Sequence, residues 1–124
     1  MSKTLRGLRG ATTATANTSE AILNATDELL RALQQANGFQ PEDVESAIFT
    51  SSPDLTAEYP ARAARRLGWL DVPLLGAAEV AVLDGVPRCI RVLLHFYTTK
   101  SQRELKHMYL RDAATLRPDR PPPS

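Results

Sequence analysis

Hydrophobic and polar residues alternate along several segments of the chain, most clearly in RCIRVLLHFYTT at residues 88–99. A repeat of two places successive side chains on opposite faces of a β-strand, and branched and aromatic residues favour strands. The segment is therefore predicted to be a strand with two different faces. One face carries Ile90, Val92, Leu94 and Phe96, and the other carries Cys89, Arg91, Leu93, His95 and Tyr97.

Arg91 stands inside this predicted strand, and no acidic residue is beside it in the sequence. A buried guanidinium without a partner costs several kcal/mol. The residues alone leave two arrangements open. Either the aliphatic stem packs on the sheet while the charged head reaches solvent, or the fold brings a ligand or a carboxylate to the guanidinium.

A helical repeat occupies residues 19–36, where apolar residues recur at spacings of three and four. The run Asn17–Glu20 contains residues that cap helix N-termini, followed by a carboxylate suited to the first turn. Asn37-Gly38 predicts a left-handed cap at the C-terminal end. The apolar stripe is expected to be core, and it consists of Ile22, Ala25, Leu29, Leu30, Leu33 and Ala36.

Shorter patterns predict the remaining elements. Gly7 and Gly10 interrupt the first strand, which suggests a bulge or a close approach of backbone or ligand. Cys89 is expected to be a small core residue, and His95 and His107 to be structural or exposed. The predicted elements are strands at 4–13, 44–51, 72–78 and 109–116, a turn at 40–43, and short helices at 59–67 and 100–106.

This order of elements predicts an α+β fold, with a mixed β-sheet and helices on one face. Few connections are long enough for a fully parallel sheet. The strands carry much apolar surface for so short a chain, so the sheet is expected to pack against other subunits. Residues 1–117 are predicted to form a single domain, and 118–124 a flexible proline-rich tail.

Composition excludes several classes of protein. The chain has 124 residues and a formal net charge of +1, so no overall field draws it to nucleic acid or to a membrane surface. It has 1 cysteine and therefore no internal disulfide, which suits a reducing compartment. The N-terminus lacks the apolar run of a signal peptide, and no window resembles a membrane helix. A cytoplasmic protein is expected.

Common catalytic motifs are missing. The chain contains no GxSxG, no Walker sequence, no dinucleotide fingerprint and no cluster of cysteine and histidine, so neither a metal nor a cofactor is expected. What remains is a set of arginines in or beside apolar segments, together with Glu79 and Tyr109. Guanidinium groups bind carboxylates in a bidentate way, so the sequence favours a site for a small polyanion.

Six stretches in order, RGLRGATT, SSPDL, YPARAAR, GAAE, RCIRV and HMYLRDAATLRPD, resemble the monofunctional chorismate mutases of the Bacillus type. The resemblance spans Arg6 to Asp119. It implies a homotrimer with a pseudo-α/β-barrel core and active sites at subunit interfaces. It also implies conversion of chorismate to prephenate, on the route to phenylalanine and tyrosine, without metal or cofactor.

By that resemblance, Arg9 binds a substrate carboxylate, Arg91 faces the breaking ether oxygen, and Glu79 accepts from the ring hydroxyl. Tyr109 matches a tyrosine that contacts the side-chain carboxylate. Leu116 and Arg117 match the place where the family's C-terminal tail approaches the site. Residues that match an aromatic and two basic side chains at the pocket mouth, supplied by the neighbouring subunit, are Tyr59, Arg62 and Arg65.

The chain departs from the family pattern at Leu75 and Gly76, where the type member has threonine and cysteine. One side-chain contact to the substrate hydroxyl is lost there, so Glu79 and backbone groups are expected to take it over. The expected substrate-binding stretch is Leu75, Gly76, Ala77 and Ala78.

The implied mechanism is electrostatic and conformational. A guanidinium aimed at an oxygen that gains negative charge stabilises the transition state by roughly 3–4 kcal/mol. Holding the enolpyruvyl chain over the ring in its reactive conformer contributes further. No nucleophile or proton transfer is needed, which fits the missing catalytic motifs.

Two other functions remain open. One is a non-catalytic trimeric module that binds a small carboxylate, which the loss of polar side chains at Leu75 and Gly76 would favour. The other is an enamine or imine hydrolase of similar architecture. The arginines at Arg62, Arg65 and Arg66 also fit an ordinary solvated helix face.

Overall fold

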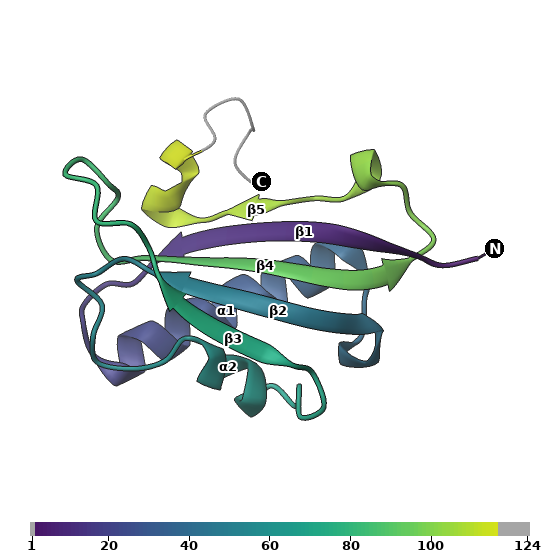
Figure 1. Ribbon diagram of the computed structural model, residues 1–124, viewed down its shortest axis with the longest axis horizontal. Coiled ribbons are helices and arrows are strands. Elements are labelled where there is room, and N and C mark those ends of the chain that lie inside the picture. Colours follow the sequence, from purple (N-terminus) through teal and green to yellow (C-terminus); the bar gives the residue numbers. More distant parts are fainter. Residues whose placement is uncertain (1, 117–124) are drawn as a thin grey trace.

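The computed structural model describes residues 2–116, so the predicted tail at 118–124 lies outside the described residues. One sheet with the strand order β3-β2-β4-β1-β5 dominates the fold (Figure 1). The strands are β1 (Thr4–Thr13), β2 (Val44–Ser51), β3 (Leu74–Ala78), β4 (Cys89–Thr98) and β5 (Met108–Tyr109). The α-helices are α1 (Ser19–Asn37) and α2 (Ala61–Arg66). Short 3-10 helices are η1 (Pro41–Asp43), η2 (Gln102–Glu104) and η3 (Arg111–Leu116).

The sheet is mixed, as predicted. Strand β4 pairs antiparallel with both β1 and β2, whereas β3 lies parallel to β2 and β5 parallel to β1. Both helices lie behind the sheet in Figure 1, on the same face. The alternation in β4 explains this layering, because its apolar face is buried against the helices. That face consists of Ile90, Val92, Leu94 and Phe96, each exposed by 2% or less.

Helix α1 forms where the periodicity predicts it. The Thr18 hydroxyl accepts a hydrogen bond from the Ala21 amide, which caps the first turn. At the other end Gly38 adopts a left-handed φ of 68°, and its amide donates to the Gln34 carbonyl. The predicted stripe, from Ile22 to Leu33, is largely buried and packs on β1.

Gly10 is required by close packing and not by a bulge. The pairing of β1 with β4 runs without a shift from Thr4 opposite Thr98 to Thr13 opposite Cys89. A Cβ atom at position 10 would lie 2.8 Å from the Leu33 Cδ1 atom. The bulge expected at the glycines is therefore wrong, and what lies close to Gly10 is the leucine side chains of α1, not the backbone or ligand that the sequence suggested.

The strand predicted at 109–116 is wrong. Strand β5 ends at Tyr109, and the chain turns into η3. Arg111 adopts a φ of 53°, which ends the extended conformation. Its guanidinium makes two hydrogen bonds to the Glu28 carboxylate of α1, at 3.1 and 3.0 Å, and so holds this turn against the helix.

The other boundaries shift only slightly. The helix predicted at 100–106 is reduced to the single turn of η2, and the helix predicted at 59–67 to α2. Strand β3 begins at Leu74, two residues later than predicted. Within residues 2–116, no helix has the length and apolar character needed to cross a membrane.

Candidate active site

The face of the sheet that points away from the helices holds a cavity of about 240 Å³. The strand register explains its lining, because Ala11 of β1 and Thr50 of β2 both lie opposite Arg91 of β4. Arg9 lies one step along the same face, opposite Leu93. We call this cavity the arginine pocket. Its lining includes Arg9, Ala11, Ile48, Thr50, Glu79, Arg91, Leu93, Tyr109 and Leu116.

Arg91 and Glu79 form an ion pair in this pocket, with 3.4 Å between Nε and Oε1. The Thr50 hydroxyl donates a hydrogen bond to the same Glu79 Oε1 atom at 2.5 Å. The backbone amide of Glu79 donates to the Ser51 carbonyl at 2.9 Å, which fixes this residue where β3 ends. The Glu79 carboxylate is therefore held from two sides before any ligand binds.

The arginine in β4 is not buried. The Arg91 side chain is 47% exposed and has a carboxylate partner, so the fold provides both arrangements that the sequence left open. The stem lies on the sheet, the head reaches the open pocket, and Glu79 balances its charge. Glu79 is thus the carboxylate that the fold brings to Arg91.

Tyr109 contributes a buried polar atom to the same pocket. It lies in β5 opposite Ala11, and the Leu110 amide that follows donates to the Ala11 carbonyl at 2.8 Å. Tyr109 is 8% exposed, and its hydroxyl finds no hydrogen-bond partner among residues 2–116. Buried hydroxyls are almost always paired, so an unpaired one beside a cavity indicates a group that pairs with a ligand.

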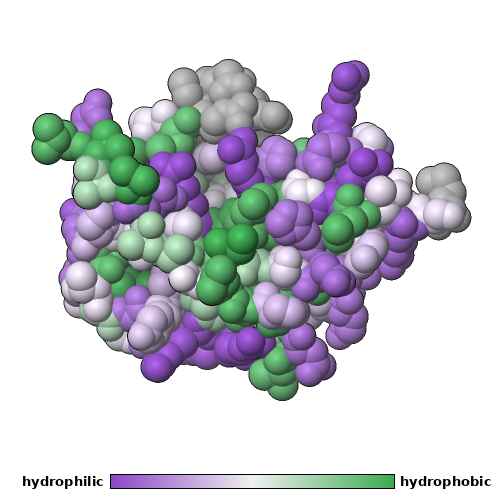
Figure 2. Space-filling view, in the orientation of Figure 1, coloured by the Kyte–Doolittle hydropathy of each residue, from purple (hydrophilic) through white to green (hydrophobic). Residues whose placement is uncertain are grey.

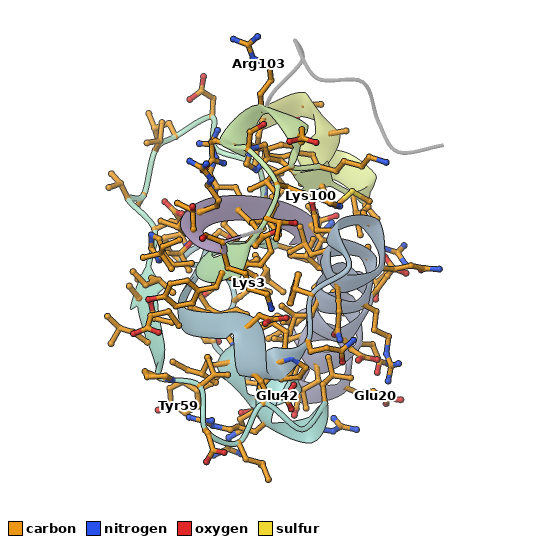
Figure 3. All side chains as sticks on the ribbon, turned by 90° about the vertical axis from the view of Figure 1, so that its right-hand side faces the viewer. Lys3, Glu20, Glu42, Tyr59, Lys100 and Arg103 are labelled. Atoms are coloured by element: carbon orange, nitrogen blue, oxygen red, sulfur yellow. The ribbon has the colours of Figure 1, made fainter. Side chains whose placement is uncertain are left out.

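A second group of predicted residues lies at the β3 edge of the sheet. Tyr59, Arg62, Arg65 and Gly76 line a cavity of about 240 Å³, which we call the edge pocket. Tyr59 is 69% exposed and projects from the end of the molecule opposite Arg103 (Figure 3). The Arg62 guanidinium lies 5.6 Å from the centre of the Tyr59 ring.

Arg65 has a structural contact that the sequence did not predict. Its guanidinium donates to the carbonyl oxygens of Trp69 and Leu70, the latter at 2.8 Å. These bonds fix the turn that follows α2. Arg62, by contrast, pairs only loosely with the Glu58 carboxylate, at 3.3 Å and with 63% of its side chain exposed. Of the two, Arg62 is freer to meet a ligand.

The predicted stretch from Leu75 to Ala78 forms β3 and does not line the arginine pocket. Leu75 lies opposite Ile48 on the open face and is 63% exposed. Gly76, Ala77 and Ala78 line a further cavity of about 420 Å³ together with Tyr59. Within one chain the predicted site residues therefore form two separate groups.

A hydrogen-bond network that the sequence did not reveal fixes the start of β4. The Asp54 carboxylate accepts from the Arg88 amide at 2.9 Å and from the Ser52 hydroxyl at 2.5 Å. The Ser52 hydroxyl in turn accepts from the Cys89 amide. The Ser52 hydroxyl, followed by the Arg88 amide, lowers the pKa of Asp54.

This network holds Arg88 at a φ of 50°, which a non-glycine residue rarely adopts. It lies three residues before Arg91 and next to Cys89. Cys89 is buried, as predicted, and burial raises the pKa of its thiol. The only sequence signal for the network is the SSPD run at 51–54, which is also typical of an ordinary turn. Across residues 2–116, no three histidine, cysteine or carboxylate side chains gather as a metal site would need.

Comparison with known proteins finds close relatives of this chain. The family model for chorismate mutase type I matches residues 5–120. Chorismate mutase AroH of Thermus thermophilus is 49% identical over 93% of this chain and 95% of that protein. Chorismate mutase AroH of Bacillus subtilis is 41% identical over 93% of this chain and 91% of that protein.

A solved structure agrees with the sequence comparisons. A chorismate mutase from Clostridium thermocellum superposes with a TM-score of 0.86 and 39% identity, covering 88% of this chain and 97% of that one. The segment matched by the family model includes every residue that lines the arginine pocket and the edge pocket.

Proposed function

Because the chain belongs to the chorismate mutase type I family, we propose that the arginine pocket binds chorismate and accelerates its rearrangement. Family membership makes the protein an isomerase with chorismate mutase activity, the intramolecular conversion of chorismate to prephenate. The proposal concerns how it does so. The observation that carries it is the juxtaposition of Arg9, Glu79, Arg91 and Tyr109 around one cavity.

The lining of the pocket matches the chemistry of the substrate. Chorismate carries two carboxylates, a ring hydroxyl and an ether oxygen. Arg9 and the Tyr109 hydroxyl are placed to bind one carboxylate, and the unpaired state of that hydroxyl supports this role. Glu79 accepts from the ring hydroxyl, and Leu116 covers the apolar ring. Ile48 and Leu93 supply an apolar wall beside the reacting chain.

Arg91 acts on the reaction itself. As the carbon–oxygen bond of the ether breaks and the new carbon–carbon bond forms, negative charge develops on the ether oxygen. The Arg91 guanidinium, already oriented by Glu79 at 3.4 Å, meets that charge without reorganisation. One such donor contributes roughly 3–4 kcal/mol to the transition state. No proton moves, and no covalent intermediate forms.

Restriction of the substrate supplies the rest of the acceleration. The enolpyruvyl side chain must fold over the ring before the new bond forms. A carboxylate held by Arg9 on β1 and the ether oxygen held by Arg91 on β4 fix the side chain at two points and keep it in that conformer. Both arginines stand on strands that pair directly with each other, which keeps their spacing fixed.

We further propose that the site is completed by a second copy of the chain, in a cytoplasmic homotrimer. In one chain the arginine pocket is open, and Tyr59 and Arg62 of the edge pocket lie apart from it. Figure 2 shows apolar side chains gathered on the open sheet face and on the loop between β3 and β4. Exposed apolar residues there include Leu5, Leu75, Val80, Val82, Leu83 and Tyr97.

An uncovered sheet face with this much apolar surface is typical of a subunit interface. Packing three such faces around an axis would form the pseudo-α/β barrel and bring the edge pocket of one chain over the arginine pocket of the next. Tyr59 and Arg62 would then close the mouth of the site from the neighbouring subunit. Gly76 would offer backbone groups where other members of the family have a side chain.

A direct assay tests the proposed chemistry. Purified protein is mixed with chorismate in the presence of a chelator, and the loss of diene absorbance is followed beside Arg91→Ala. We expect turnover by the wild type and a fall of at least about a hundredfold in kcat for the variant. Equal rates for the two proteins would remove Arg91 from the mechanism. Binding of chorismate without turnover by the wild type would instead make the protein a carboxylate-binding module.

A further inference from the structure

His107 contacts the backbone of a residue that lines the arginine pocket. Its Nδ1 atom accepts a hydrogen bond from the Arg9 amide, with 3.0 Å between the two nitrogens. Because the amide is a donor, Nδ1 carries no proton in this arrangement. The bond lies at the outer edge of β1, immediately before β5 begins at Met108.

Along this part of β1, side chains provide the hydrogen bonds that a neighbouring strand would otherwise supply. Strand β5 pairs only with Gly10 and Ala11, so the edge of β1 before them needs other partners. At Gly7, the Gln102 side-chain amide both accepts from the backbone N–H, at 3.1 Å, and donates to the carbonyl, at 2.5 Å. His107 then provides the acceptor at Arg9.

The segment that carries His107 is itself fixed by α1. Asn37, the last residue of the helix, is 3% exposed. Its side-chain amide donates to the Lys106 carbonyl at 3.0 Å and accepts from the Lys106 amide at 2.8 Å. This pair of bonds holds the backbone next to His107 in one position, so the imidazole reaches the Arg9 amide from a rigid base.

Arg9 has particular need of such an anchor. It stands between Gly7 and Gly10, and glycine leaves the backbone of a strand freer than other residues do. Its inner edge is fixed by pairing opposite Leu93 of β4. Without His107, no residue of the described segment after η2 would accept a hydrogen bond from the Arg9 amide at this outer edge.

We propose that His107 is a positioning residue for the reaction: its Nδ1 atom fixes the backbone of Arg9 and thereby aims the Arg9 guanidinium at the substrate carboxylate. The inference rests on the proposed function, in which Arg9 binds that carboxylate. Because a carboxylate is bound in both the ground state and the transition state, loss of the anchor should chiefly raise KM, with a smaller fall in kcat from the weaker restriction of the substrate.

Two substitutions at His107 separate this role from packing. His107→Asn keeps an acceptor, because the asparagine Oδ1 atom occupies nearly the place of Nδ1, whereas His107→Leu keeps bulk and removes the acceptor. We expect KM of the leucine variant to rise about five- to tenfold, which corresponds to one hydrogen bond. The asparagine variant should stay within about twofold of the wild type.

A double-mutant cycle identifies the residue through which His107 acts. Arg9→Ala alone should raise KM strongly, and adding His107→Leu to it should cause no further rise. Additive effects in the cycle would overturn the inference, as would a leucine variant that folds with wild-type KM, or an asparagine variant as impaired as the leucine one. If the leucine variant does not fold, His107→Gln replaces it, because its acceptor is one carbon farther from the backbone and should miss the Arg9 amide.

The wild-type and Arg9→Ala arms keep this inference distinct from the proposed function. No turnover of chorismate by the wild type would contradict the proposed function itself. If Arg9→Ala turns chorismate over with an unchanged KM, Arg9 does not bind the substrate. His107 then has no positioning role through Arg9. A raised KM in Arg9→Ala beside a normal KM in His107→Leu would contradict the role of His107 alone.

Discussion

Glu79 Oε1 lies 3.4 Å from Arg91 Nε, and this pair joins the end of β3 to the beginning of β4 on the open face of the sheet. The side chains are 29% and 47% exposed, so the pair sits in a wet pocket and not in the core. Its contribution to stability is therefore small. The ion pair instead orients the Arg91 guanidinium before the substrate binds.

Glu79→Ala should therefore affect activity far more than stability. Loss of the acceptor for the ring hydroxyl, and of the partner that orients Arg91, should lower kcat/KM by about 10–100-fold. The free energy of unfolding should change by less than about 1 kcal/mol, because the pair is half exposed. Steady-state kinetics and urea unfolding measure the two effects. Glu79→Gln, which keeps the acceptor oxygen, should retain more activity, and equal loss in both variants would contradict the role of the acceptor.

Tyr109→Phe removes a buried hydroxyl that has no partner among residues 2–116. Without a hydrogen bond to lose, the folded protein should be as stable as the wild type or more stable by up to about 1 kcal/mol. KM should rise about tenfold, because the hydroxyl pairs with the substrate carboxylate only in the complex. Kinetics and thermal unfolding test this together. A less stable variant with normal KM would give the hydroxyl a structural role instead.

Asp54 should make folding sensitive to acid. Its pKa is lowered in the folded protein by the Ser52 hydroxyl and then the Arg88 amide, so folding favours the ionised carboxylate. That stability is present above the unfolded pKa of about 3.9 and disappears as the pH falls through the lowered folded pKa. Asp54→Asn should lose roughly 1 kcal/mol at pH 7, an amount reduced by the exposure of the group, and progressively less as the pH falls below the unfolded pKa.

Chemical unfolding of the wild type and Asp54→Asn across this pH range measures the difference between them. The two stability curves should converge in acid. Curves that stay parallel would show that the carboxylate charge is not what holds Arg88.

Gly10→Ala should destabilise the fold, whereas Gly7→Ala on the same strand should not. A Cβ atom at position 10 meets Leu33 Cδ1 at 2.8 Å and Leu29 Cδ1 at 3.0 Å, while position 7 has nothing within 4 Å. Displacing two buried leucines should cost about 1–2 kcal/mol. Gly7→Ala should be neutral or slightly stabilising, by up to about 0.5–1 kcal/mol, because it reduces the freedom of the unfolded chain. Thermal unfolding of Gly10→Ala and Gly7→Ala measures the two changes in stability. Equal changes would contradict the packing explanation.

The sequence predicts most of this fold because its signals are local. The alternation around Arg91 and the caps at Thr18 and Gly38 act within a few residues, and strands β1, β2 and β4 and helix α1 form where those signals place them. The prediction of a strand at 109–116 fails because Arg111 turns the chain there, and its contact with Glu28 joins residues 83 positions apart. No local pattern records such a contact.

The candidate site, too, was predictable only in part. Its residue types come from the sequence and the family resemblance, but the register of β1, β2 and β4 is what brings Arg9, Thr50 and Arg91 together. Thr50 escaped prediction because a threonine in a strand is ordinary, and His107 because its partner is a backbone amide. For Arg91 the sequence left two arrangements open, and only the fold shows that the head reaches an open pocket and also pairs with Glu79.

In the proposed trimer, each site combines the arginine pocket of one chain with the edge pocket of another. Two variants are prepared, Arg91→Ala and the double substitution Tyr59→Ala/Arg62→Ala, each expected to retain less than about a hundredth of wild-type activity. Arg66→Ala, on the same helix but outside both pockets, serves as a control that should retain normal kinetics.

The decisive measurement is the activity of the two inactive variants after coexpression in equal amounts. In a trimer with composite sites, every mixed assembly contains one site built from an intact arginine pocket and an intact edge pocket. Random mixing should therefore restore about a quarter of the wild-type rate. A mixture that stays as inactive as its components, although mixed trimers are isolated with two different tags, would show that each site lies within a single chain.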